Sequence, residues 1–155
     1  MVNEAPQNGQ TTDALQQRFA DEILETHAFR GDETVAVRPD RILEILSFLR
    51  DEPALSFDFL TDLCGVHYPE KEHQYEVVYH LYSFPHNHRL RLKARLSGDG
   101  HITSVTSLYP AANWLEREAY DMVGIRFEGH PDLRRILMPD DFEGHPLRRD
   151  FPLTG

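Results

Sequence analysis

The segment Arg89-Leu-Arg-Leu-Lys-Ala-Arg-Leu96 alternates between cationic and apolar side chains. A period of two places the cations on one face of a strand and the apolar residues on the other, which predicts a strand with one buried face. Tyr75 to Ser83 is rich in β-branched and aromatic residues, and Phe84 to His88 favours a turn between the two strands. The cationic row is either a solvated outer face or a docking face for an acidic partner.

Further helices and strands are predicted on both sides of this hairpin. Thr12 is the expected N-cap of the first helix, and Gly124 is the expected C′ residue of the last. The predicted helices cover residues 12–29, 39–52 and 111–123, and the predicted strands cover 33–37, 57–67, 75–83, 89–96 and 101–108. This order favours the α+β class: a two-layer sandwich of a mostly antiparallel or mixed sheet with helices on one face, plus an extended C-terminal arm.

The chain divides into three parts by composition. Residues 1–11 predict a disordered tail, 12–124 an α+β domain, and 125–155 an extended docking arm rich in proline and glycine.

Length, charge and cysteine content exclude several classes of protein. The 155 residues hold 16 Lys and Arg against 26 Asp and Glu, a net charge of −10, which argues against a general nucleic-acid binder. Cys64 is the single cysteine, so an intramolecular disulfide and a Cys₄ metal site are excluded. No apolar run approaches the roughly 18–20 residues of a membrane helix. The polar start lacks a signal-peptide pattern, so we expect a cytosol-like compartment and membrane contact only through a partner.

Two pairs of possible metal ligands give one alternative function. Cys64 and His67 form a Cys-x₂-His pair, and His86 and His88 form a second pair. If their strands were neighbours, these side chains could meet in a small metal-dependent enzyme, but histidines beside a turn are common without any metal. No nucleophile elbow and no glycine-rich phosphate loop occurs. We therefore predict no catalytic residue and no cofactor bound by this chain.

A motif is repeated within the predicted arm. Phe127-Glu-Gly-His-Pro-Asp-Leu-Arg-Arg135 recurs as Phe142-Glu-Gly-His-Pro-Leu-Arg-Arg149, with one residue deleted. Such an extended segment cannot bury its aromatic residues by itself, so it must pack on its own domain or on another protein.

The helix before the arm carries charges of both signs. Arg117 and Asp121 are four residues apart and can pair on one face. Glu118 and Asp121 repel each other unless a cation lies between them, and an arginine of the arm could supply it by folding back. Glu116 and Glu118, two residues apart, point to different sides and cannot act as an acid/base pair. The candidate arginines are Arg134, Arg135, Arg148 and Arg149.

The stretch from Trp114 to Pro152 resembles the signature of the NADH-quinone oxidoreductase C subunit, the small hydrophilic peripheral-arm component of respiratory complex I. The signature positions implied to lie at subunit interfaces are Glu116, Arg117, Glu118, Asp121, Gly124, Phe127, His130, Pro131, Arg134, Arg135, Gly144, His145, Pro146, Arg148, Arg149, Asp150 and Phe151. The resemblance implies that charged residues of the helix contact the arginines of the arm. The helix residues are Glu116, Arg117, Glu118 and Asp121, and the arginines are Arg134, Arg135, Arg148 and Arg149. It also implies that Phe127, Phe142 and Phe151 anchor the arm.

This resemblance implies a non-catalytic structural subunit of a proton-translocating NADH:quinone oxidoreductase. The parent complex uses FMN, iron–sulfur clusters, NADH and quinone. The implied partners are two other peripheral-arm subunits, the one that forms the quinone site and the one that carries the terminal iron–sulfur cluster. The implied location is the cytoplasmic face of a bacterial inner membrane. The equivalent subunit of a related ferredoxin-linked or hydrogenase membrane complex is the alternative.

Overall fold

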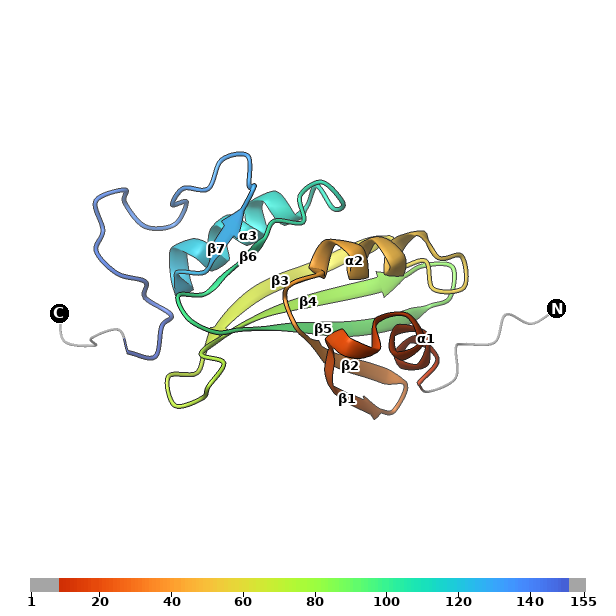
Figure 1. Cartoon of the computed structure of the whole chain (residues 1–155). Coiled ribbons are helices and arrows are strands. Elements are labelled where there is room, and N and C mark those ends of the chain that lie inside the picture. The colour runs from red at the N-terminus through yellow and green to blue at the C-terminus, as the bar shows by residue number, and fades with distance from the viewer. Residues whose placement is uncertain (1–8, 151–155) are drawn as a thin grey trace.

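The computed structural model of the chain describes residues 9–150, and a five-stranded mixed sheet lies at its centre (Figure 1). The order of the strands across the sheet is β1-β2-β5-β4-β3. Strand β2 runs parallel to β5, and the other neighbours are antiparallel. The strands are β1 (Ile23–Phe29), β2 (Asp32–Val37), β3 (Phe59–His67), β4 (Tyr75–Ser83) and β5 (His88–Leu96).

The helices pack on one face of this sheet and share a single apolar core with it. They are α1 (Gln10–Phe19), the short 3₁₀ helix η1 (Ala20–Glu22), α2 (Ile42–Asp51) and α3 (Ala112–Val123). The alternation of residues 89–96 is confirmed, since Leu90, Leu92, Ala94 and Leu96 are each at most 2% exposed. The predicted α+β sandwich with helices on one face is therefore confirmed.

The first predicted helix is too long, because residues 23–29 form the edge strand β1. Phe29 pairs with Asp32 across a two-residue turn at Arg30 and Gly31, whose φ angles are 51° and 85°. Two positive φ angles produce the tight hairpin turn that matches the twist of paired strands. Thr12 is not the N-cap, since α1 begins at Gln10.

The predicted strand at 101–108 is also too long. Strand β6 (His101–Thr103) is short and pairs in parallel with β7 (Arg126–Glu128). Ile125 and Phe127 are 0% and 2% exposed, so the first residues of the predicted arm contribute to the core. Ser104 still donates its N–H to the carbonyl of Glu128 in β7, and the turn that follows β6 binds Glu116 of α3, as described below.

The ends of the chain are described only in part. Residues 1–8 of the predicted tail lie outside the described range, whereas Gln10 already belongs to α1 and Thr11 is 1% exposed. Phe151, one of the signature positions, lies outside the range as well. Within residues 9–150 no helix has the length and apolar character needed to cross a bilayer.

Candidate functional site

The arm that follows β7 returns to α3 of the same chain (Figure 1). Residues 129–150 contain neither helix nor strand. The conformation of this segment is therefore held by contacts with α3 and β3. The residues that make these contacts define the candidate site.

Asp121, near the end of α3, is fully buried and holds the arm through its carboxylate. One oxygen accepts a hydrogen bond from Arg135 Nη1 at 2.7 Å. The other accepts the backbone N–H groups of Ile136, Leu137 and Met138 at 3.2, 2.7 and 2.9 Å. Burial raises the pKa of Asp121, but the bonds from Met138, Leu137 and Arg135 lower it more, so this pKa lies below its ordinary value. An ionised carboxylate thus fixes four donors of the arm at one point. We call this contact the Asp121 clasp.

The two histidines of the repeated motif bind opposite ends of α3. His130 Nε2 donates to the carbonyl of Asn113 at 3.0 Å, and its Nδ1 accepts the N–H of Asp132 at 2.9 Å. His145 Nδ1 donates to the carbonyl of Asp121 at 3.0 Å. Because a carbonyl can only accept a hydrogen bond, each ring carries a proton on the nitrogen that faces the helix. The repeat therefore attaches the arm once near the start of α3 and once near its end.

The end of α3 leaves room for the second of these rings. Gly124 caps the helix with φ 89°, as the sequence predicted. A Cβ atom built on Gly124 would lie 2.8 Å from His145 Cδ2, closer than such atoms approach one another. Arg135 Nη2 donates to the carbonyl of Gly144 at 2.7 Å, and Leu147 N donates to Met122 O at 2.7 Å. The two halves of the arm are thereby joined beside the helix end.

Glu116 is fully buried on the other side of α3 and binds the turn after β6. Its carboxylate accepts hydrogen bonds from Ser104 Oγ at 2.6 Å and from Val105 N at 2.9 Å. Burial raises the pKa of Glu116 above its ordinary value, although the bonds from Ser104 and Val105 oppose this shift. The expectation that Glu116 braces an arginine of the arm is wrong, because both oxygens are occupied by the turn. Its role is to shape the loop that leads into α3.

The last described residues of the arm lie against β3 and β4. Arg149 N donates to Nδ1 of the buried His67 at 3.2 Å, and the His67 ring stacks on Tyr75 with ring centroids 4.9 Å apart. Burial lowers the pKa of His67. The Arg148 guanidinium lies 5.6 Å from the centre of the Tyr75 ring. Sequence reasoning missed these roles of His67 and Tyr75, because the partner groups are 70 or more residues away along the chain.

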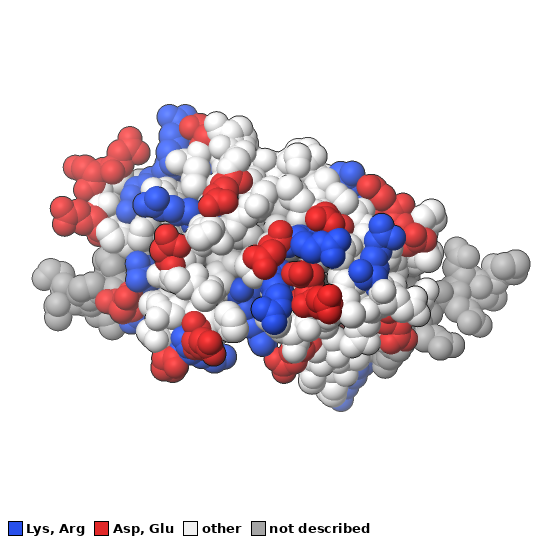
Figure 2. Space-filling model, in the orientation of Figure 1, with Lys and Arg blue, Asp and Glu red and all other residues white. Residues whose placement is uncertain are grey.

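Apolar side chains remain exposed around this folded arm. Trp114 on α3 is 51% exposed, and Leu137 and Leu147 on the arm are 50% and 64% exposed. We call these three residues the arm surface. Figure 2 shows positive and negative side chains interspersed on the face of the molecule that it presents, without one dominant sign. Exposed apolar residues on an ordered scaffold are typical of a surface that another protein covers.

The signature positions are distributed over the interior and the surface of this region. The buried positions are Glu116, Asp121 and Phe127. The half-buried positions are Arg117, Glu118, Gly124, His130, Arg135, His145, Pro146 and Arg148. The exposed positions are Pro131, Arg134, Gly144, Arg149 and Asp150.

The predicted fold-back of an arginine onto the helix is confirmed for Arg135, which pairs with Asp121. Arg117 does not pair with Asp121 in the described part of the chain. Instead its Nε donates to the carbonyl of Arg134 at 3.4 Å, and its guanidinium lies 5.7 Å from the centre of the Trp114 ring. Arg134 pairs with Asp132 at 3.0 Å. Arg134 and Arg135 are thus both paired within the chain.

The alternative of a metal site is wrong. Cys64 and His67 lie on β3, where His67 is opposite Tyr75 at the start of β4, whereas His88 is opposite Ser83 at its end. Eight residues of strand separate these two ends by roughly 25 Å. His86 binds the carbonyl of Pro53 at 2.8 Å, and His88 binds Glu33 at 2.5 Å. No cluster of three or more metal-binding side chains occurs within residues 9–150.

The molecule is thus an α+β sandwich with helices on one face and a C-terminal arm that packs on α3 and leaves some apolar side chains exposed. Residues 35–155 match the model of the family described as "Respiratory-chain NADH dehydrogenase, 30 Kd subunit", and the chain belongs to this family. The resemblance that the signature predicted is therefore confirmed.

Relatives of known name agree with this family. The chain is 52% identical over 142 residues to the NADH-quinone oxidoreductase C subunit 2 of Rhizobium etli, which covers 91% of this chain and 75% of that protein. It is 53% identical over 140 residues to the NADH-quinone oxidoreductase C subunit of Roseiflexus castenholzii, covering 90% and 80%. Its fold matches a chain of the membrane-bound sulfane sulfur reductase, an archaeal respiratory membrane complex, with a TM-score of 0.77, 26% identity, and coverage of 92% of this chain and 83% of that one.

Proposed function

We propose that this chain is a non-catalytic structural subunit of a proton-translocating NADH:quinone oxidoreductase, and that electrons pass through its neighbours only. Membership of the family is the observation that carries this proposal. The parent enzyme would use FMN, iron–sulfur clusters, NADH and quinone, and this chain would bind none of them. The ionisable groups at the site support a structural role, because Glu116 and Asp121 are both occupied by hydrogen bonds within the chain.

The arm surface is the proposed contact with neighbouring subunits. The Asp121 clasp and the two histidines hold the arm on α3, so that Trp114, Leu137 and Leu147 are presented on a fixed scaffold. An interface that is ordered before binding loses less conformational entropy on assembly than a mobile segment would. The signature residues would thus act mainly by shaping the arm, and their neighbours Leu137 and Leu147 would make the contacts.

The proposed partners are the subunit that forms the quinone site and the iron–sulfur subunit that carries the terminal cluster. The proposed location is the cytoplasmic face of a bacterial inner membrane. Residues 125–155 would form the docking arm, although Ile125 and Phe127 also complete the core of the domain. Membrane contact would then be indirect, through the complex.

The equivalent subunit of another membrane oxidoreductase is a second candidate function. The fold match to a chain of the sulfane sulfur reductase supports it, at 26% identity. The sequence identities of 52% and 53% to C subunits of NADH-quinone oxidoreductase favour the first candidate. Comparing NADH with other electron donors in the purified complex distinguishes the two.

Substitution of the arm surface tests the proposed contact. Leu137→Ser combined with Leu147→Ser should leave the melting temperature of the isolated chain nearly unchanged, since both side chains are at least half exposed. The same variant should be lost from the detergent-extracted complex. The matched control is Asp140→Ser combined with Glu143→Ser, two exposed arm positions, which should remain bound. Retention of the leucine variant at the level of the natural chain would contradict the proposed contact.

A further inference from the structure

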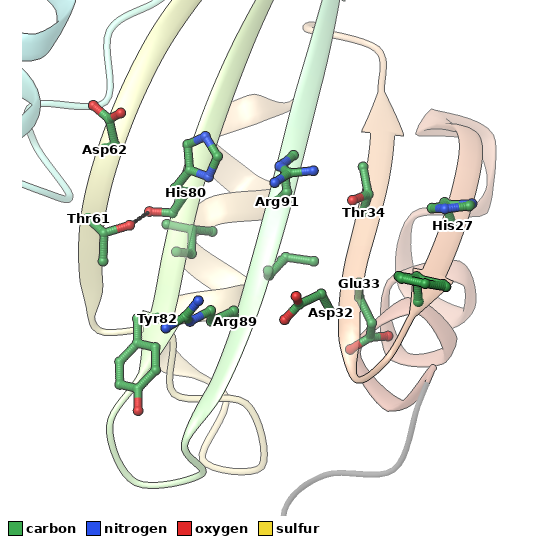
Figure 3. A pocket seen from close by; sticks show the side chains of 13 residues that line it. His27, Asp32, Glu33, Thr34, Thr61, Asp62, His80, Tyr82, Arg89 and Arg91 are labelled. Carbon is green, nitrogen blue, oxygen red and sulfur yellow. Dashed lines mark hydrogen bonds between the residues drawn. The ribbon is translucent and has the colours of Figure 1, made fainter.

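The second face of the sheet carries no helix in the described part of the chain. In Figure 3 the helices lie behind the strands, and side chains such as Arg91, His80 and Thr34 stand in front of the strands. One row crosses all five strands in direct register and consists of Asp62, His80, Arg91, Thr34 and His27. We call the side of the sheet opposite the helices, which carries this row, the open face. Its side chains are mostly polar and line a hollow of about 590 Å³.

The cations of the open face fall into two pairs with different surroundings. Arg95 pairs with Glu25 at 2.5 Å and lies 3.7 Å from Glu76, and Lys93 lies 3.8 Å from Glu76. Arg89 and Arg91, by contrast, form no ion pair within 4.0 Å in residues 9–150. The sequence predicted one cationic row, but the structure neutralises half of it internally. The other half stays unpaired in a chain that has a net charge of −10.

Arg91 forms no ion pair with the described groups around it. Its register neighbours are His80 on β4 and Thr34 on β2. Burial lowers the pKa of His80, and the charge of Arg91 lowers it further, so the ring is neutral near pH 7. Asp32 and Asp62 also line the hollow, but neither forms an ion pair with an arginine within the described residues. A guanidinium that is free on a sheet face can form a bidentate contact with a carboxylate.

Exposed aromatic rings lie beside these arginines. Tyr82 is the register partner of both Phe59 and Arg89. Phe59 and Phe84 are 47% and 63% exposed, and the Phe84 ring contacts Phe59 and Tyr82 with centroids 5.5 and 4.9 Å apart. We call these three rings the aromatic cluster. Aromatic residues and arginine are the types enriched at the energetic centres of protein interfaces.

We infer that the open face is a second docking surface, and that its occupant is an acidic segment of a neighbouring subunit. Carboxylates of that segment would bind Arg89 and Arg91, and an apolar side chain would cover the aromatic cluster. A second copy of this chain would present the same unpaired arginines and is disfavoured by like-charge repulsion. Nucleic acid is disfavoured because its affinity rests on many phosphate contacts, and this face offers two unpaired arginines on a chain with a net charge of −10, whereas a protein segment needs only one or two carboxylates to bind them. The inference rests on the proposed function in one respect, because the proposed function places the chain within an assembly.

Charge reversal in the intact complex gives the first test. Arg91→Glu should increase the dissociation rate of this chain from the detergent-extracted complex at least tenfold at moderate salt. The melting temperature of the isolated chain should change little, because Arg91 is exposed and unpaired. Arg18→Glu on α1 is the matched control, since Arg18 is also exposed and forms no ion pair within 4.0 Å in the described residues. Equal retention of the two variants would overturn the inference.

A charge-preserving substitution identifies the chemistry of the occupant. Arg91→Lys introduces an amine that carbodiimide can couple to a carboxylate in contact with it. In the purified complex we expect an amide cross-link from position 91 to an Asp or Glu of a neighbouring subunit, found by mass spectrometry. Cross-links to acidic residues of this chain alone, or to a second copy of it, would overturn the inference.

Hydroxyl-radical labelling separates this inference from the proposed function. Tyr82 and Phe84 should be labelled several-fold more slowly in the complex than in the isolated chain. Equal labelling in a complex that contains the chain would overturn the inference alone. Absence of the chain from the active complex would instead refute the proposed function.

Discussion

Replacement of Asp121 by alanine should release the arm from α3 while the sheet remains folded. The carboxylate accepts four hydrogen bonds, one from Arg135 and three from consecutive backbone amides. A hydrogen bond to a charged group contributes about 1.5–3 kcal/mol, but these donors are only partly buried and regain water when the arm opens, so we assign about 1 kcal/mol to each. Four such bonds amount to about 4 kcal/mol, which corresponds to a roughly thousandfold rise in the population of the open arm.

Hydrogen exchange of the isolated full-length chain measures this opening. Amides 136–138 should exchange up to about a thousandfold faster in Asp121→Ala, whereas the amides of β4 and β5 should keep their protection. Glu118→Ala is the control, because Glu118 lies on the same helix but its carboxylate forms no hydrogen bond within residues 9–150. Unchanged exchange at 136–138 would refute the reasoning, as would equal acceleration throughout the chain.

Three further predictions concern the groups around α3. Glu116→Ala should lower the free energy of unfolding by about 3 kcal/mol or more in denaturant titrations, because it leaves the buried N–H of Val105 without an acceptor, removes the bond from Ser104 and opens a cavity, whereas the isosteric Glu116→Gln should cost less than about 1 kcal/mol. Gly124→Ala should cost about 1–2 kcal/mol from its left-handed φ and should displace His145, which NMR of that ring would detect. The folded-state pKa of His67 is lowered, so the stability it contributes is complete above its unfolded pKa of about 6.5 and decreases as the pH falls below it. The protection factor of the Arg149 amide, which is its intrinsic exchange rate divided by the observed rate at the same pH, should therefore fall between pH 7 and pH 5, and a fall that persists in His67→Gln would contradict this assignment.

The sandwich could be predicted from the sequence because its central strands carry local patterns. The alternation of residues 89–96 identifies both faces of β5 without reference to any partner. Strand β1 was missed because the spacing of Leu15, Phe19 and Ile23 continues a helical pattern into it. What selects a strand there is pairing with β2, an interaction between segments that the local pattern does not contain.

The candidate site was predicted in outline but not in its contacts. Opposite charges indicated that an arginine of the arm would reach the helix, and Arg135 does so. Most of the other contacts of Asp121, His130 and His145 are to backbone groups. Because nearly every residue has the same backbone groups, the sequence does not indicate which of them will bind. The sequence therefore left open whether the arm packs on its own domain or on a partner, and the contact with α3 and its hydrogen bonds required the structure.

The direct test of a structural role is the activity of the complex purified from cells that lack this chain. If the chain is a scaffold, NADH:quinone activity and the assembled peripheral part should both be lost. Adding back the full-length chain, which should show no NADH oxidation by itself, should restore both. Full NADH:quinone activity in a complex without this chain would contradict the account, and so would turnover by the isolated chain.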